Sequence, residues 1–344
     1  MDDSFSRALS QLKGFSGFRS ATVSRREDLD NAGADLRLFE AVLASGGDER
    51  IAVDPSTGRN RYGVPSGRAA DEVWLSSSTA TAISPWGFDA AHLAFQNLMA
   101  SAAAPSVSGW FERIHARLLE LFGVPGANII LSASGTEAEL IVRVLAGNLL
   151  RHPLTSLLVA PTETGSGVPL AAAGRHFLGS APFAAQVQRG EPLQGLSADA
   201  ETEAVAIRDE AGAPLSREAV DAAVAARVEA AMARGRDVLI HVLDCSKTNR
   251  SGPSRAVAAD LRQKFGDRIL VVVDGCQLRC SREQIRSDLD AGFMVANGRK
   301  RNSHSRQSAR VVGLQSPQLK FGPLSPLRAD FDVYAFKAEF LQLH

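Results

Sequence analysis

The chain has 344 residues, of which 45% are hydrophobic and 22% charged, and its formal net charge is zero. This length and composition predict a globular protein with one large core and room for a smaller second domain. The balanced charge argues against nucleic acid or an anionic membrane as the main partner. No apolar run reaches membrane-spanning length, and the 3 cysteines lack the spacing of a zinc site. A cytoplasmic protein without a bound metal is therefore the default expectation.

The first part of the chain, 1–70, is polar and irregular, and we interpret it as an N-terminal arm with loops. Short helices are expected around 5–15 and 36–44. The run from Asp54 to Gly63 combines Pro, Gly and Asn residues, which predicts an ordered loop. A longer helix is expected at 108–122. Its apolar stripe, at helical spacing, consists of Ile114, Leu118, Leu121 and Phe122.

Short apolar runs alternate with helical segments in the middle of the chain. The expected strands are 129–131, 156–160, 204–208, 238–243 and 269–273. The expected helices are 136–149, 170–176 and 217–234. Short and almost wholly apolar strands separated by helices are typical of a parallel sheet that is buried on both faces. The sequence therefore predicts an α/β fold with a mostly parallel central sheet.

The composition changes after about Ala296, where the run NGRKRNSHSRQSAR places several arginines among polar residues. The remaining residues, 311–344, show little periodicity before a helical pattern near 333–343. A solvated loop and a lost reading frame are both compatible with this change. We treat 301–344 as an atypical C-terminal tail.

The segment SASGTEAE, residues 132–139, runs from a predicted strand into a predicted helix. Open α/β sheets bind ligands at the carboxyl ends of their strands, and small residues there allow close approach to the backbone. The first amides of a helix point at an anion, so Ser134, Gly135 and Thr136 are candidates for binding a phosphate. The alternative is an ordinary helix cap by Ser134 or Thr136.

Asp274 ends the apolar strand VVVDGCQ. A carboxylate at the end of a buried strand is costly unless a cationic partner compensates its charge. The alternative is that Asp274 caps the following helix. His241, within the apolar run LIHVL, is interpreted as a core histidine with satisfied ring nitrogens.

Two lysines follow predicted strands and are candidates for a Schiff base. Lys300 follows the apolar segment 292–296, and Lys247 lies in the sequence DCSKT. Most lysines are solvated surface charges, so neither position is decisive alone.

Taken in order, SGTEAE, ETGSG, DCSKT, VVVDGCQLR and a glycine–x–lysine resemble the fold-type-I pyridoxal-phosphate (PLP) superfamily. The resemblance is closest to class-V aminotransferases and cysteine desulfurase-like enzymes, and it covers 60–300. It implies a three-layer PLP-transferase large domain at 71–300, an incomplete small domain and a homodimer. It also implies PLP as the cofactor.

The resemblance implies a role for each matching residue around the cofactor. Ser134, Gly135 and Thr136 match the phosphate loop, and Thr164, after Glu163, stands where the family stacks a side chain on the ring.

On the other side of the ring, Ser246 or Asp244 falls where a polar side chain meets the ring oxygen. Asp274 matches the partner of the pyridine nitrogen and Gln277 a partner of the ring oxygen. Lys300 matches the Schiff-base lysine.

In the early loop, the residues implied to lie near the substrate are Arg59, Asn60 and Tyr62.

The implied function is PLP-dependent chemistry on a small-molecule amino acid or keto acid, with transamination through a Schiff base on Lys300 as first choice. A lyase or decarboxylase is the nearest alternative. A rival from another class is a non-catalytic remnant that keeps the fold. Two departures favour that rival: the residues after Lys300 lack the Gly/Pro turn and the apolar strand of the family, and 301–344 is short for a small domain.

Overall fold

The computed structural model describes residues 25–44, 52–69, 72–74, 81–100, 107–132, 134–179, 187–197, 199–276, 280–298 and 310–314. The chain divides into two compact units, 1–110 with 301–306, and 111–300 with 307–344. The helices expected at 5–15 and 333–343 lie outside the described residues. Within the described ranges, no helix is long and apolar enough to cross a membrane.

The first unit contains the helices α2 (Arg25–Ala44) and α3 (Pro85–Ala100). Helix α3 begins with proline at its first position, where the missing amide hydrogen costs nothing, and the Ser84 hydroxyl accepts the Gly87 amide at 3.1 Å. Phe39 of α2 packs against Phe88 and Phe95 of α3, with ring centroids 5.2 and 5.5 Å apart. Helix α2 is longer than the expected 36–44, and the sequence had not indicated α3.

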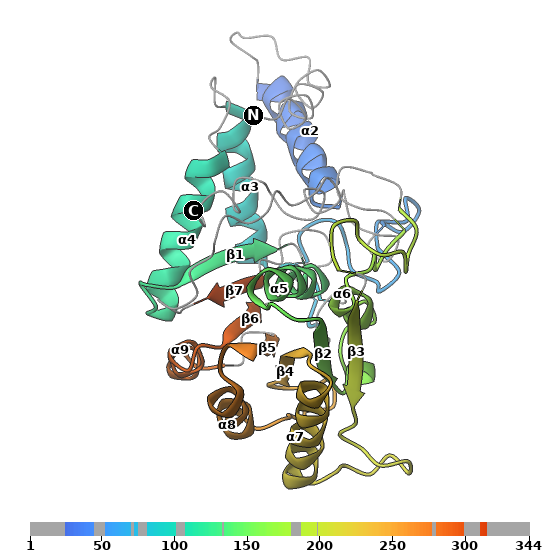
Figure 1. Ribbon diagram of the computed structural model, residues 1–344. Coiled ribbons are helices and arrows are strands. Elements are labelled where there is room, and N and C mark those ends of the chain that lie inside the picture. Colours follow the sequence, from blue (N-terminus) through green and yellow to red (C-terminus); the bar gives the residue numbers. More distant parts are fainter. Residues whose placement is uncertain are drawn as a thin grey trace. The chain divides into compact units, whose positions relative to one another are not determined.

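The second unit is built on a seven-stranded sheet in the order β1-β7-β6-β5-β4-β2-β3 (Figure 1). Strands β2 to β6 pair in parallel, whereas β7 pairs antiparallel with both β1 and β6. The strands are β1 (Asn128–Ser132), β2 (Leu154–Val159), β3 (Ala200–Val205), β4 (Asp237–Leu243), β5 (Ile269–Cys276), β6 (Met294–Gly298) and β7 (Arg310–Leu314).

Helices cover both faces of this sheet (Figure 1). Helices α5 and α6 lie on one face, and α7, α8 and α9 lie on the other. Their bounds, with two short 3-10 helices, are α4 (Val107–Phe122), α5 (Gly135–Leu149), η2 (Pro161–Glu163), α6 (Val168–Ala172), α7 (Arg217–Ala233), α8 (Arg255–Phe265), η4 (Gly266–Arg268) and α9 (Arg282–Asp290). The fold is therefore α/β in three layers with a mostly parallel sheet, as the sequence predicts.

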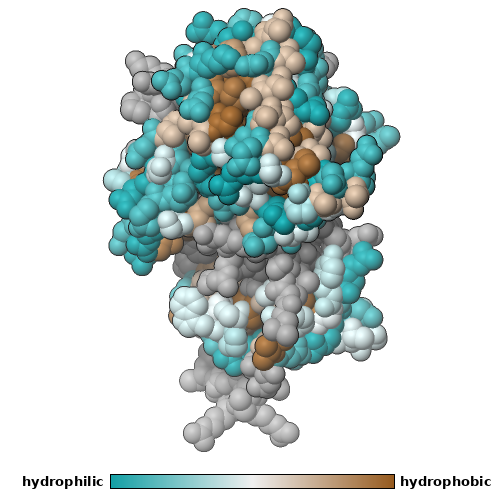
Figure 2. All heavy atoms as spheres, turned by 90° about the horizontal axis from the view of Figure 1, so that it is seen from below, coloured by the Kyte–Doolittle hydropathy of each residue, from teal (hydrophilic) through white to brown (hydrophobic). Residues whose placement is uncertain are grey.

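Side chains alternate between the two faces along the central strands, because successive strand residues point to opposite sides. Leu270 and Val272 of β5 belong to the core under α5. Their neighbours Val271 and Val273 belong to the core under α7 and α8. Viewed from the end where α7, α8 and α9 lie, the described surface is mostly hydrophilic with apolar residues in between (Figure 2).

Several boundaries differ from the expected ones. Helix α6 ends at Ala172 rather than near 176, and β3 spans 200–205 rather than 204–208. Helix α4 buries Leu118 and Phe122 in the core, while Ile114 and Leu121 of the expected stripe stay 43% and 40% exposed. Strand β7 lies within the segment assigned to the tail, between β1 and β6 in the sheet.

Candidate functional site

The amino end of α5 lies directly after β1, at the carboxyl edge of the parallel strands. The Ser134 side chain caps α5 and accepts the Glu137 amide at 3.2 Å. The Ser134 carbonyl accepts the Ala138 amide at 2.9 Å. The amides of Gly135 and Thr136 precede the first intrahelical hydrogen bond, and such groups at a helix start are donors for an anion. The cap and the phosphate-loop interpretation are therefore compatible in one structure.

The loop after β2 lies against this helix start. A Cβ atom added to Gly167 would lie 2.8 Å from Thr136 Cγ2 and 3.4 Å from Thr136 Oγ1. A side chain at position 167 would therefore force the Thr136 side chain to shift, because real Cβ atoms essentially never approach another heavy atom within 3 Å. The sequence ETGSG thus places a glycine where the Thr136 side chain needs the space.

Asp274 lies on the same face of the sheet as α5. Its position follows from the alternation along β5, in which Leu270 and Val272 face α5. In register, Asp274 stands between Leu243 of β4 and Ala296 of β6. The half-buried Asp274 and the amino end of α5 are therefore both at the carboxyl edge, where the sequence predicts them, and they lie on one face of the sheet.

Thr164, Ser246 and Lys247 also lie at this edge. The Thr164 hydroxyl donates to the Pro161 carbonyl at 2.9 Å, and the Lys247 ammonium donates to the Thr164 carbonyl. The buried Ser246 hydroxyl donates to Glu163 at 2.8 Å and accepts the amides of Thr248 and Arg250 at 3.1 Å. The structure thus places the Ser246 hydroxyl in a network that joins its own loop to the loop after β2.

Asp244, the other residue expected near the ring oxygen, is engaged by an arginine. Its carboxylate accepts Arg255 Nη2 at 2.8 Å, while Arg255 Nε donates to the buried Asp288 at 2.7 Å. Burial raises the pKa of the nearby Cys280 thiol, and with the Asp244 carboxylate brings it to about 12. Cys280 therefore stays a thiol near neutral pH and is no nucleophile there.

A buried acid–base pair lies deeper on the same face. His241 Nδ1 of β4 is 3.3 Å from Glu139 Oε1 of α5, and both residues are under 10% exposed. His241 Nε2 has no hydrogen-bond partner among the described residues. This corrects the interpretation of His241 as a core histidine with satisfied ring nitrogens, because Nε2 lacks a partner among the described residues.

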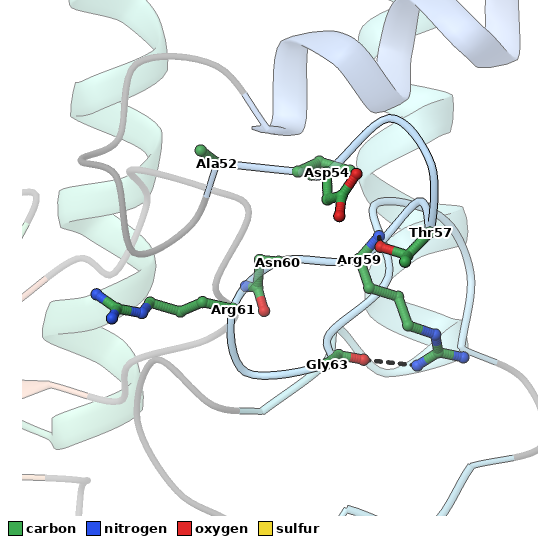
Figure 3. A pocket seen from close by; sticks show the side chains of 8 residues that line it. Ala52, Asp54, Thr57, Arg59, Asn60, Arg61 and Gly63 are labelled. Atoms are coloured by element: carbon green, nitrogen blue, oxygen red, sulfur yellow. Dashed lines mark hydrogen bonds between the residues drawn. The ribbon is translucent and has the colours of Figure 1, made fainter.

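Arg59 and Asn60 belong to the first unit and line a hollow of about 620 Å³ (Figure 3), and the exposed Tyr62 lies in the same loop. The Arg59 guanidinium turns back onto the Gly63 carbonyl at 2.5 Å and pairs with Glu72. The Asn60 amide oxygen accepts the amides of Tyr62 and Val64 at 2.9 and 3.1 Å. Both side chains thus stabilise the predicted loop.

Gln277 and Lys300 lie outside the described residues. Strand β6 ends at Gly298, paired with Cys276 at the same edge of the sheet. No cluster of His, Cys, Asp and Glu suited to a metal ion occurs in the described part of the chain.

From the sequence, Glu163 was named only as the neighbour of Thr164, and its position at the centre of this edge was missed. Glu163 binds Ser246, Thr248 and Arg208, from two other loops. A Glu four residues after the buried strand β2 was the available signal. Its partners are more than forty positions away in sequence, and no periodicity indicates them.

Comparison with family models gave no match, and neither did comparison with curated proteins. Among solved structures, similarity was found to a provisionally assigned histidinol-phosphate aminotransferase from Erwinia carotovora atroseptica (12% identity, TM-score 0.47, 80% of this chain and 68% of that one). An aspartate aminotransferase from Trypanosoma cruzi shares 11% identity at TM-score 0.43, over 88% of this chain and 64% of that one. A tryptophan decarboxylase from Catharanthus roseus, in complex with L-tryptophan, shares 10% identity at TM-score 0.41, over 100% of this chain and 74% of that one. At these values, the assignment of fold rests on the strand order and helix layers described above.

Proposed function

We propose that this chain is a PLP-dependent enzyme that acts on an amino acid, with transamination as its reaction. The observation that supports the proposal is the position of Asp274 and the amino end of α5 on one face of the sheet at one edge. An anion-binding helix start and a half-buried carboxylate on one face at one edge of the sheet suit a ligand with a phosphate at one end and a cationic ring nitrogen at the other. PLP is such a ligand.

Different residues at this edge would bind different parts of the cofactor. The amides of Gly135 and Thr136, with the Thr136 hydroxyl, would donate hydrogen bonds to the phosphate. Asp274 would keep a proton on the ring nitrogen through its negative charge. Bound PLP supplies an electron sink for the substrate.

Thr164, Ser246 and Gln277 are proposed, from the sequence resemblance, to border the ring. Lys300 is proposed to bind the cofactor covalently and to move the substrate proton. Lys247 remains the alternative, because its ammonium lies at the edge beside Thr164. From the sequence we likewise propose that the chain is related to class-V aminotransferases, forms a homodimer and is cytoplasmic.

A titration of the purified protein with PLP, followed by absorbance, tests this function. We expect an absorption band near the boundary between the ultraviolet and the visible range, which disappears on borohydride reduction. Peptide mass spectrometry then identifies the modified lysine. Asp274→Ala should abolish or greatly weaken the band. The exposed Asp290→Ala on α9 serves as the matched control and should leave the band unchanged.

The second candidate, a non-catalytic remnant, is favoured by the charged sequence around Lys300. It predicts a cooperatively folding protein in which PLP produces no such band. If the band forms, product analysis with a panel of amino acids separates the reactions. A keto acid indicates transamination, whereas an amine and carbon dioxide indicate decarboxylation.

A further inference from the structure

The Glu163 carboxylate lies at the centre of three loops. It accepts Arg208 Nε at 2.6 Å and Ser246 Oγ at 2.8 Å, and it also accepts the Thr248 hydroxyl. Its side chain is only 12% exposed. The Glu163 carbonyl accepts the Lys247 amide at 3.2 Å. Both its side chain and its backbone therefore bind the loop after β4.

These contacts connect three neighbouring strands. Glu163 follows β2, Arg208 follows β3 and Ser246 follows β4, and these strands are adjacent in the order β4-β2-β3. Arg208 Nη2 also donates to Thr248 Oγ1 at 2.8 Å, and Arg208 Nη1 donates to the Gly212 carbonyl at 3.0 Å. One half-buried ion pair thus joins the loops at the carboxyl ends of all three strands.

Glu163 is held as an anion. Burial raises the pKa of its carboxyl group, but the hydrogen bonds from Thr248, Arg208 and Ser246 outweigh burial and bring the pKa to about 2. A group with this pKa stays ionised at neutral pH and is a poor general acid or base there. Its role in the site is therefore positional.

The same loop continues to the candidate phosphate site. Thr164, the next residue, accepts the Lys247 ammonium through its carbonyl. Two and four residues after Glu163, Gly165 and Gly167 face the Thr136 side chain. A displacement of Glu163 would move the neighbours of both Thr136 and Lys247.

We infer that Glu163 is a positioning residue that fixes the loops after β2, β3 and β4 and thereby shapes one side of the PLP site. The part of this inference that concerns PLP rests on the proposed function. Small misplacements of binding groups are expensive, so loosening these loops should weaken cofactor binding.

Two measurements on full-length Glu163→Ala test the inference together. Hydrogen exchange of the protein without cofactor should become faster in peptides covering 205–213 and 244–252, and stay unchanged in β1 and the first turns of α5. Absorbance titration with PLP should show binding weakened roughly 10- to 100-fold. Glu163→Gln, which keeps one accepting oxygen, should show smaller changes in both measurements.

Glu201→Ala is the matched control. Glu201 accepts Thr155 Oγ1 at 2.8 Å and Arg234 Nη2 at 2.5 Å, so it also joins a hydroxyl and an arginine. It pairs with the second residue of β2, at the amino end of the parallel strands. Its loss should leave exchange at 244–252 and PLP affinity unchanged.

If Glu163→Ala does not fold, the isosteric Thr248→Val removes one donor to Glu163 and should shift both measurements in the same direction. Unchanged exchange in the two loops would overturn the inference, and so would faster exchange with unaltered PLP affinity. If the unmodified protein binds no PLP, the proposed function is wrong, while the exchange data still decide whether Glu163 holds the loops.

Discussion

Replacing Gly167 with alanine tests the close approach between the loop after β2 and the start of α5. Gly167 has φ −90° and ψ −14°, which alanine adopts without strain. Alanine gives the unfolded chain less conformational entropy than glycine. The substitution should therefore by itself raise the free energy of unfolding by about 0.4–1 kcal/mol. The new Cβ would lie 2.8 Å from Thr136 Cγ2 and 3.3 Å from Phe177 Cβ, however. Overpacking of this kind costs about 1–3 kcal/mol.

The net expectation is a loss of about 1–2 kcal/mol in the free energy of unfolding, measured by urea denaturation. Rotation of the Thr136 side chain would relieve the clash but move its hydroxyl. A hydrogen bond to a charged group contributes about 1.5–3 kcal/mol, so PLP affinity should fall roughly 10- to 100-fold.

Two further variants sharpen this test. Gly165→Ala, two residues earlier, would place its Cβ at ordinary contact distances of 3.4 Å from Val168 and 3.9 Å from Thr136, and should be tolerated. Thr136→Ser removes the clashing Cγ2 and should restore stability and affinity in the Gly167→Ala background. If Gly167→Ala matches the unmodified protein in both measurements, the reasoning about this contact is wrong.

Three other predictions concern the same region. Ser134→Ala and Ser254→Ala each remove a helix cap, and each should lower the free energy of unfolding in urea by about 1 kcal/mol. Only Ser134→Ala should weaken PLP binding. Equal PLP affinities of the two variants would contradict the phosphate-loop role. Cys280, whose pKa burial raises to about 12, should resist iodoacetamide at pH 8 in the folded protein and react in urea; rapid labelling by peptide mass spectrometry would contradict its burial. The Glu163 pKa lies at about 2, below the value of 4.5 that is ordinary for a glutamate, so the stability advantage over Glu163→Gln should be complete above about pH 5 and decline as the pH falls towards 2. A pH-independent difference in urea midpoints would argue against it.

The parallel sheet and the helix after β1 could be predicted from the sequence because they depend on local patterns. The strands β4 and β5 are continuous apolar runs, and the start of α5 carries Ser134 as a cap. Asp274 could be placed at the edge because it ends such a run.

Other elements carried cues that were too short or too polar to stand out. Helices α8 and α9 begin after Ser254 and Ser281, which cap them in the structure. On average their residues are polar, so that few apolar residues mark the buried face of each helix in the sequence. Strand β7 has only five residues, and its place between β1 and β6 depends on pairing with strands far away in sequence.

The network around Glu163 could not be predicted, because it depends on three loops meeting in space. Arg208 and Thr248 are ordinary polar residues in sequence. Only the order β4-β2-β3 brings their loops to one carboxylate. Long-range polar contacts of this kind require the topology before they can be recognised.

A crystal structure of the protein grown with PLP tests the central claim most directly. We predict density for the phosphate within about 2.7–3.2 Å of the Gly135 and Thr136 amide nitrogens, with the ring nitrogen at the Asp274 carboxylate. PLP bound elsewhere, or a helix start and Asp274 that contact only solvent at saturating PLP, would contradict it.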